Sequence, residues 1–167
     1  KYFLHTVEEN DVTKVVLDIK EVDVTPTEVV GTSVTPVPTA TTAPSTGGGL
    51  SNAFSKGNQT ITGTATSNSV RITRYNFIDL GSLFTYRLFL GDDLYPNVSS
   101  TLDGTTLTIV VSNVASDAIV GNGGTGSTNF NARGVENINK VDITNASNKS
   151  TFVFDLDANY EYRIYIN

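Results

Sequence analysis

The sequence contains no cysteine, no methionine and no tryptophan, and its only histidine is His5. Without cysteine the chain can form neither a disulfide nor a thiolate zinc site, and it has no thiol nucleophile. One histidine is too few for a histidine-rich metal centre, and a catalytic triad would need an acid and a nucleophile held beside it. This inventory predicts no metal and no cofactor, and it favours a binding or structural domain over an enzyme.

Positive charge is scarce as well. Eleven Lys and Arg residues stand against 17 Asp and Glu, which leaves a formal net charge of -6, and no basic run occurs. Nucleic acid and anionic membranes attract concentrated positive charge, so neither is an expected partner. No stretch reaches the ~20 apolar residues of a membrane span. The chain begins with Lys1 and shows no signal peptide or initiator methionine, which we interpret as a piece of a longer precursor.

What the chain does contain favours β-structure. Hydrophobic residues make up 38% of it, and Ser, Thr, Asn and Gly are abundant. β-Branched and aromatic side chains suit strands, whereas strong helix formers are few. The pair Asp103-Gly104 suits a tight hairpin turn, and the only candidate for a short helix is Ser51 to Lys56. Alternating apolar and polar residues predict strands over residues 13–19, 59–66, 70–72, 83–90, 105–111, 135–144, 151–156 and 160–166.

Composition divides the chain into three parts. Four of the five prolines lie in a Pro/Thr-rich run, residues 25–50, that ends in three glycines. Such a segment cannot bury a core and is a linker or a long surface loop. It separates an N-terminal strand segment, residues 1–24, from a β-domain, residues 51–167. Thr/Pro linkers are typical of secreted proteins, which favours an extracellular or cell-wall location. The N-terminal strand can dock in its own chain or in a neighbour, so a strand-exchanged homodimer is an open alternative.

An internal repeat is the strongest pattern in the β-domain. Three segments recur in the same order, and the second copy carries five extra residues around Asn145 to Lys149. Such repeated β-units predict an all-β sandwich of two pseudo-symmetric sheets packed face to face. The matched segments are Asn68–Thr73 with Asn139–Thr144, Phe77–Leu80 with Val153–Leu156, and Tyr86–Leu90 with Tyr162–Ile166.

Alternation within the last matched segments places an arginine and a ring on the outer face of each copy. Arg87 and Phe89 point outward in the first copy, as do Arg163 and Tyr165 in the second. Guanidinium groups bind carboxylates, and rings stack on the apolar faces of sugars. The other interpretation is structural, with Arg87 and Arg163 in cross-strand ion pairs with Asp79 and Asp155. The two interpretations can both hold.

Residues 58–167 resemble the AMIN domain, which accompanies N-acetylmuramoyl-L-alanine amidases and some secretins. The resemblance lies in Arg71-Ile-Thr, Tyr86-Arg-Leu-Phe-Leu and the strand from Leu102 to Asn113, and again in Val135 to Val141, Ser150 to Leu156 and Tyr162 to Ile166. It implies a symmetric β-sandwich that binds peptidoglycan, with Arg87, Arg163 and Arg71 as ligand-binding residues. Lys14 and Ser150-Thr151 depart from the family pattern, which often has an arginine there.

Three further patterns carry less weight. Gly121 to Gly126 has dinucleotide-binding glycine spacing but is followed by no helix, so a surface loop is expected. Asp155 to Glu161 imitates a calcium loop, yet Tyr160 and Ile166 stand where glycine and a bidentate acid are needed. Other acids, such as Asp103, lie in turn-like contexts. The sequence thus predicts a non-catalytic binding module for peptidoglycan or another wall glycan. The alternative is a structural or adhesive domain of a surface-layer protein.

Overall fold

The computed structural model describes residues 12–22, 52–67, 69–91, 94–119, 126–129, 134–135, 137–146, 148–158 and 160–167, without the side chains of 116–119 and 127–129. Several predicted features lie outside these residues. They are His5, the Pro/Thr-rich run at 25–50 and most of the glycine-rich segment Gly121 to Gly126.

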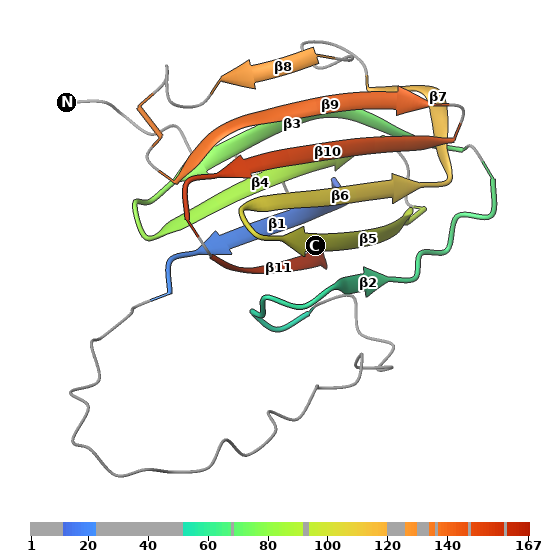
Figure 1. Ribbon diagram of the computed structural model, residues 1–167. Coiled ribbons are helices and arrows are strands. Elements are labelled where there is room, and N and C mark those ends of the chain that lie inside the picture. Colours follow the sequence, from blue (N-terminus) through green and yellow to red (C-terminus); the bar gives the residue numbers. More distant parts are fainter. Residues whose placement is uncertain are drawn as a thin grey trace, which may run out of the picture.

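Eleven strands and no helix make up the described part of the chain (Figure 1). The short helix considered for Ser51 to Lys56 is absent over its described residues; Ser55 instead forms an isolated β-bridge with Tyr162. The strands are β1 (Lys14–Lys20), β2 (Gln59–Ile61), β3 (Val70–Asp79), β4 (Leu83–Leu90), β5 (Asn97–Asp103), β6 (Thr106–Ser112), β7 (Val114–Ile119), β8 (Gly126–Asn129), β9 (Ile138–Ala146), β10 (Lys149–Leu156) and β11 (Glu161–Ile166).

The strands form two sheets that pack face to face, which confirms the predicted all-β sandwich. Sheet A has the order β11-β1-β4-β3-β7, and sheet B has the order β2-β5-β6-β10-β9-β8. Neighbours are antiparallel except β3 and β7, which run parallel. The predicted tight turn joins β5 to β6, where Gly104 adopts a φ of 58° that favours glycine.

The core lies between the sheets and is built by alternation. Residues at every second position of each long strand point inward, as Tyr86, Leu88 and Leu90 do on β4. Strand β1 contributes Val15 and Leu17 and lies inside sheet A, between β4 and β11. Strand β1, which lies in the predicted N-terminal segment, is therefore an integral part of this sandwich.

The repeated segments occupy different positions in the two sheets. Tyr86–Leu90 lies in β4 and Tyr162–Ile166 in β11, and both strands flank β1 in sheet A. The other first-copy segments share one strand, β3, whereas their second-copy counterparts lie in β9 and β10 of sheet B. The five extra residues, Asn145–Lys149, span the junction of β9 and β10, where Asn145 and Ala146 end β9 and Lys149 begins β10. The two copies share side-chain alternation but differ in strand topology.

The outer edge of β11 is covered by Asn52 and by Gln59, the first residue of β2. The Gln59 side chain donates from Nε2 to the Tyr162 carbonyl over 2.7 Å and accepts from the Ile164 amide over 2.9 Å. Asn52 donates to the Ile164 carbonyl from its backbone and side chain. Gln59 is only 5% exposed. These contacts pair the backbone groups of β11 that an exposed sheet edge would leave open.

Candidate functional site

The outer face of sheet A, the side that points away from sheet B, carries every residue that the sequence predicts for ligand binding. Arg87 and Phe89 lie on β4, Arg163 and Tyr165 on β11, and Arg71 on β3. Each alternates with a residue of the buried core, which directs its side chain outward. Strand β1 lies between β4 and β11, so the predicted residues belong to one continuous surface.

Arg163 is held by Asp18, its direct cross-strand partner on β1. The guanidinium donates from Nε and from Nη2 to Asp18 Oδ2 over 2.9 and 2.8 Å. Thr85 on the other side of β1 donates to Oδ1 over 2.7 Å. The Asp18 side chain is 3% exposed and that of Arg163 is 36% exposed. Asp18 therefore joins β1 to both neighbouring strands.

Arg163 forms a cross-strand ion pair, as the structural interpretation predicts, but its partner is Asp18 and not Asp155. Asp155 lies in sheet B, where it faces Lys140 across the β9–β10 pair, and therefore cannot reach Arg163. Asp79 instead accepts from the Gly81 amide in the β3–β4 turn. Strand β1, which lies between β4 and β11, supplies Asp18 as the partner of Arg163 in place of Asp155.

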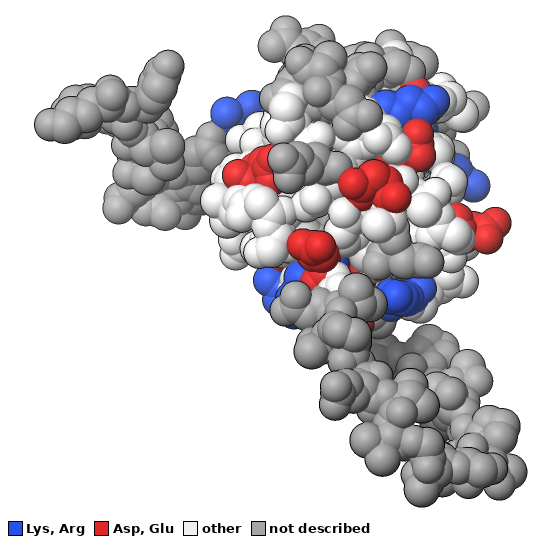
Figure 2. Space-filling view, turned by 60° about the vertical axis from the view of Figure 1, so that its left-hand side comes forward, with Lys and Arg blue, Asp and Glu red and all other residues white. Residues whose placement is uncertain are grey.

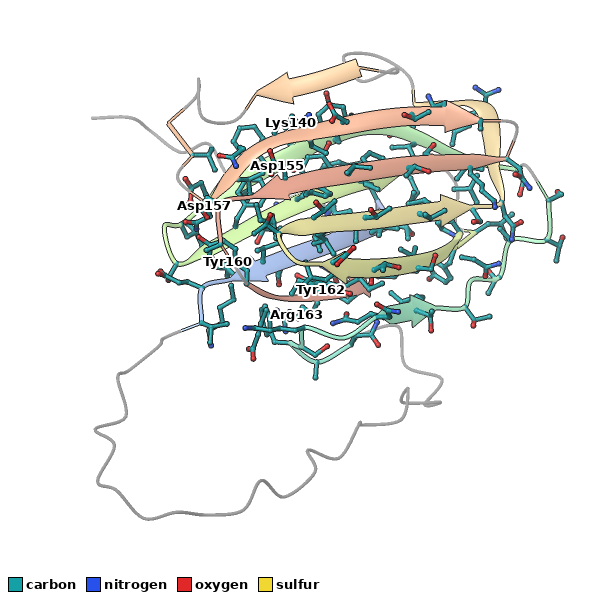
Figure 3. All side chains as sticks on the ribbon, viewed as in Figure 1. Lys140, Asp155, Asp157, Tyr160, Tyr162 and Arg163 are labelled. Carbon is teal, nitrogen blue, oxygen red and sulfur yellow. The ribbon has the colours of Figure 1, made fainter. Side chains whose placement is uncertain are left out.

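Two rings enclose the Arg163 guanidinium. Its Cζ lies 4.7 Å from the ring centroid of Phe54 and 4.9 Å from that of Tyr165. Burial raises the pKa of Tyr165, and the nearby Asp18 carboxylate adds to the rise because it repels the ionised phenolate. Figure 3 shows Arg163 next to Tyr162 along β11, and the alternation of the strand directs Tyr162 into the core and Arg163 out of it.

Phe89 does not offer a free ring. It is 0% exposed, although it lies outside the core between the sheets. The Arg74 guanidinium lies 4.0 Å from its ring centroid, and Lys14 Nζ lies 5.5 Å from it. Cation–π contacts of this kind hold the cations in place over the ring. The predicted stacking of a ligand on Phe89 is therefore not available in this arrangement, whereas Tyr165 is half-buried.

Arg87 differs from Arg163. It is half-buried and faces Val16 on β1 and Asn76 on β3. It makes no hydrogen bond or ion pair with any described residue. Asn76 Oδ1, beside it, is buried and has no hydrogen-bond partner within the described part of the chain. Among the described residues, a guanidinium and an amide oxygen that both lack a hydrogen-bond partner therefore lie on adjacent strands.

The outer face of sheet A is cationic although the chain is acidic overall. Arg71, which is exposed, extends it along β3. The described charged side chains of this face are the cations Lys14, Lys20, Arg71, Arg74, Arg87 and Arg163 and the acids Asp18 and Glu161. Figure 2 shows an end of the sandwich, where acidic and basic side chains both lie among uncharged ones.

That end holds a smaller polar cluster. Tyr160 donates to Asp157 Oδ1 over 2.6 Å, and burial raises its pKa, with a further rise from Asp157. Lys140 pairs with Asp142 over 2.9 Å, and this hydrogen bond raises the pKa of Lys140.

Within the described ranges, no group of three or more His, Asp or Glu residues is placed to hold a metal ion. Nor does this part of the chain contain a helix suited to crossing a membrane.

Sequence reasoning missed Asp18, Asn76 and Phe54. Asp18 sits in an otherwise apolar strand, Val-Val-Leu-Asp-Ile, and a lone acid among buried positions was the available signal. Nothing local marks Phe54 or Asn76, because long-range strand pairing alone brings them beside the arginines.

Comparison with known proteins adds no identification. No protein-family model matches the chain. No curated protein matches it, and neither does any solved structure.

Proposed function

We propose that this chain is a non-catalytic, extracytoplasmic binding module that holds peptidoglycan, or a related carboxylate-bearing wall glycan, on the outer face of sheet A. The observation that carries the proposal is the state of Arg87. Arg87 is half-buried, makes no hydrogen bond or ion pair with any described residue, and lies on the cationic outer face of sheet A in a protein that is acidic overall.

The chemistry of the ligand complements this surface. Peptidoglycan has stem-peptide carboxylates, amide N–H groups and sugar rings. A carboxylate can accept a bidentate hydrogen bond from Arg87, while Asn76 Oδ1 can accept from an N–H or a hydroxyl once its side chain turns. Tyr165 lies across β1 from Arg87 in the same cross-strand row and offers a half-buried ring to a sugar.

Arg163 supports the site without being free to bind. Its hydrogen bonds to Asp18 and its contacts with Phe54 and Tyr165 fix the ring of Tyr165 against the sheet. The expected ligand-binding role of Arg163 therefore becomes a positioning role, and Arg87 carries the contact with the ligand.

Sedimentation with purified peptidoglycan sacculi tests the proposal. We expect the wild-type chain to sediment with sacculi and Arg87→Ala to bind about 10-fold or more weakly, since a charge-assisted hydrogen bond contributes about 1.5–3 kcal/mol. Lys149→Ala is the matched control, because it removes one positive charge from an exposed residue of sheet B. Amidation of the sacculus carboxylates should lower the binding of wild type. On amidated sacculi, wild type and Arg87→Ala should then bind about equally.

Two results would contradict the proposal. If wild-type protein does not sediment with sacculi, peptidoglycan is not the ligand, and a structural or adhesive role is favoured. If wild type sediments but Arg87→Ala and Lys149→Ala bind equally well, the ligand is held elsewhere.

A further inference from the structure

Strand β1 has an unusual relation to the rest of the sandwich. It is the first of the described strands, and residues 21–58 separate it from β2, yet it lies inside sheet A between β4 and β11. Both of its neighbours, β4 and β11, are antiparallel to it and pair along its whole length. Without β1 the sheet would be divided in two, because β4 and β11 do not pair with each other.

The slot between β4 and β11 is specific for the pattern of β1. Val15, Leu17 and Ile19 enter the core, and all three are at most 4% exposed. Asp18 sets the register, because it accepts hydrogen bonds from Thr85 on β4 and Arg163 on β11 at the same time. A shift of one residue would point the apolar side chains away from the core and separate Asp18 from both donors.

We propose that this slot also accepts β1 from a second copy of the chain, which produces strand-exchanged assemblies. The contacts of β1 are the same whether it comes from its own chain or from another. The balance is therefore set by the effective concentration that the connection imposes, which is in the millimolar range for short flexible linkers and falls as they lengthen. The connection between Val22 and Asn52 includes the Pro/Thr-rich run at 25–50, and its length lowers the effective concentration of β1, so exchange should increase as the protein concentration rises toward that value.

Exchange would make the outer face of sheet A a composite of two chains. The Asp18 that accepts hydrogen bonds from Arg163 and Thr85 would come from the second copy. The proposal is independent of what this face binds, since it depends only on the pairing of β1 with β4 and β11.

Disulfide trapping tests the exchange cleanly, because the chain has no cysteine of its own. Lys20 and Glu161 are direct partners in the antiparallel β1–β11 pair. Such partners have Cα atoms roughly 4.5–5.5 Å apart, within the range that a disulfide spans. Full-length Lys20→Cys and Glu161→Cys chains are mixed, unfolded in urea, refolded together at a series of protein concentrations and oxidised. The control mixture pairs Lys20→Cys with Thr106→Cys, an exposed position on sheet B.

We expect a disulfide-linked heterodimer from the first mixture, several-fold more abundant than in the control and increasing with protein concentration. The double variant Lys20→Cys/Glu161→Cys shows whether the pair closes within one chain. The proposal is overturned if that variant closes within one chain while the mixture gives no more heterodimer than the control at any concentration. It is also overturned if neither closes, because the β1–β11 register would then be wrong.

Discussion

Tyr86 and Tyr162 enter the same core from the two strands that flank β1, yet they differ in hydrogen bonding. Both are at most 2% exposed. The Tyr162 hydroxyl donates to the Gly57 carbonyl over 2.7 Å and lies 2.8 Å from Ser100 Oγ. The Tyr86 hydroxyl is buried and has no partner among the described residues, and its ring packs edge-on against Phe154. The matched tyrosines of the repeat therefore have opposite energetic roles.

Removal of each hydroxyl should change stability in opposite directions. A buried hydroxyl without a partner costs roughly 1–3 kcal/mol, so Tyr86→Phe should raise the free energy of unfolding by about 1 kcal/mol. Tyr162→Phe should lower it by about 1–2 kcal/mol, because the Gly57 carbonyl and Ser100 lose a partner. Urea unfolding of the two variants beside wild type measures both. Equal effects of the two substitutions would contradict the assignment.

The tyrosines also predict a loss of stability in alkali. Burial raises the pKa of Tyr86 and of Tyr162 above the ordinary value of 10.0. Above pH 10 the unfolded chain loses these protons while the folded chain keeps them, so unfolding becomes more favourable as pH rises. Each such tyrosine contributes up to about 1.4 kcal/mol per pH unit in this range. Urea midpoints between pH 8 and 11 should fall less steeply for Tyr86→Phe than for wild type, and parallel slopes would refute the prediction.

Substitutions of Asp18 and Arg163 should have strongly non-additive effects on the free energy of unfolding. Arg163→Leu leaves the nearly buried carboxylate without its cation and should cost about 3–5 kcal/mol. The double variant Asp18→Val/Arg163→Leu should be less destabilised than Arg163→Leu alone, because no buried charge remains. Chemical denaturation of the single and double variants gives the coupling free energy. A double variant that loses the sum of both single effects would show that the pair acts independently.

Substitution of Gln59 should lower the free energy of unfolding far more than substitution of its neighbour Thr60, whose side chain is exposed. Gln59→Leu keeps a similar volume but leaves the Tyr162 carbonyl and the Ile164 amide without their partner. We expect a loss of about 2–4 kcal/mol and faster hydrogen exchange at the Ile164 amide. Thr60→Val is the control and should be nearly neutral. Slow exchange at Ile164 in Gln59→Leu would show that the edge of β11 is closed by other groups.

Strand positions were predictable wherever inward residues were uniformly apolar. The predicted strand at 83–90 coincides with β4, and the one at 160–166 differs from β11 by one residue. β5 was missed because Ser100 interrupts its apolar alternation. Ser100 tolerates burial at 4% exposure because it accepts from the Gln59 amide and contacts the Tyr162 hydroxyl. Its partners are distant in the sequence, so no local pattern reveals them.

The sequence by itself determined which way the side chains point. A strand alternates with a period of two whatever its neighbours are, so Arg87 and Arg163 had to face opposite to Tyr86 and Tyr162. Only the tertiary structure decided which strands are adjacent. The placement of β1 between β4 and β11 gives Arg163 a carboxylate and leaves Arg87 facing Val16 and Asn76. Pairing of this kind depends on contacts between residues far apart in the chain, and those contacts leave no periodic trace in the sequence.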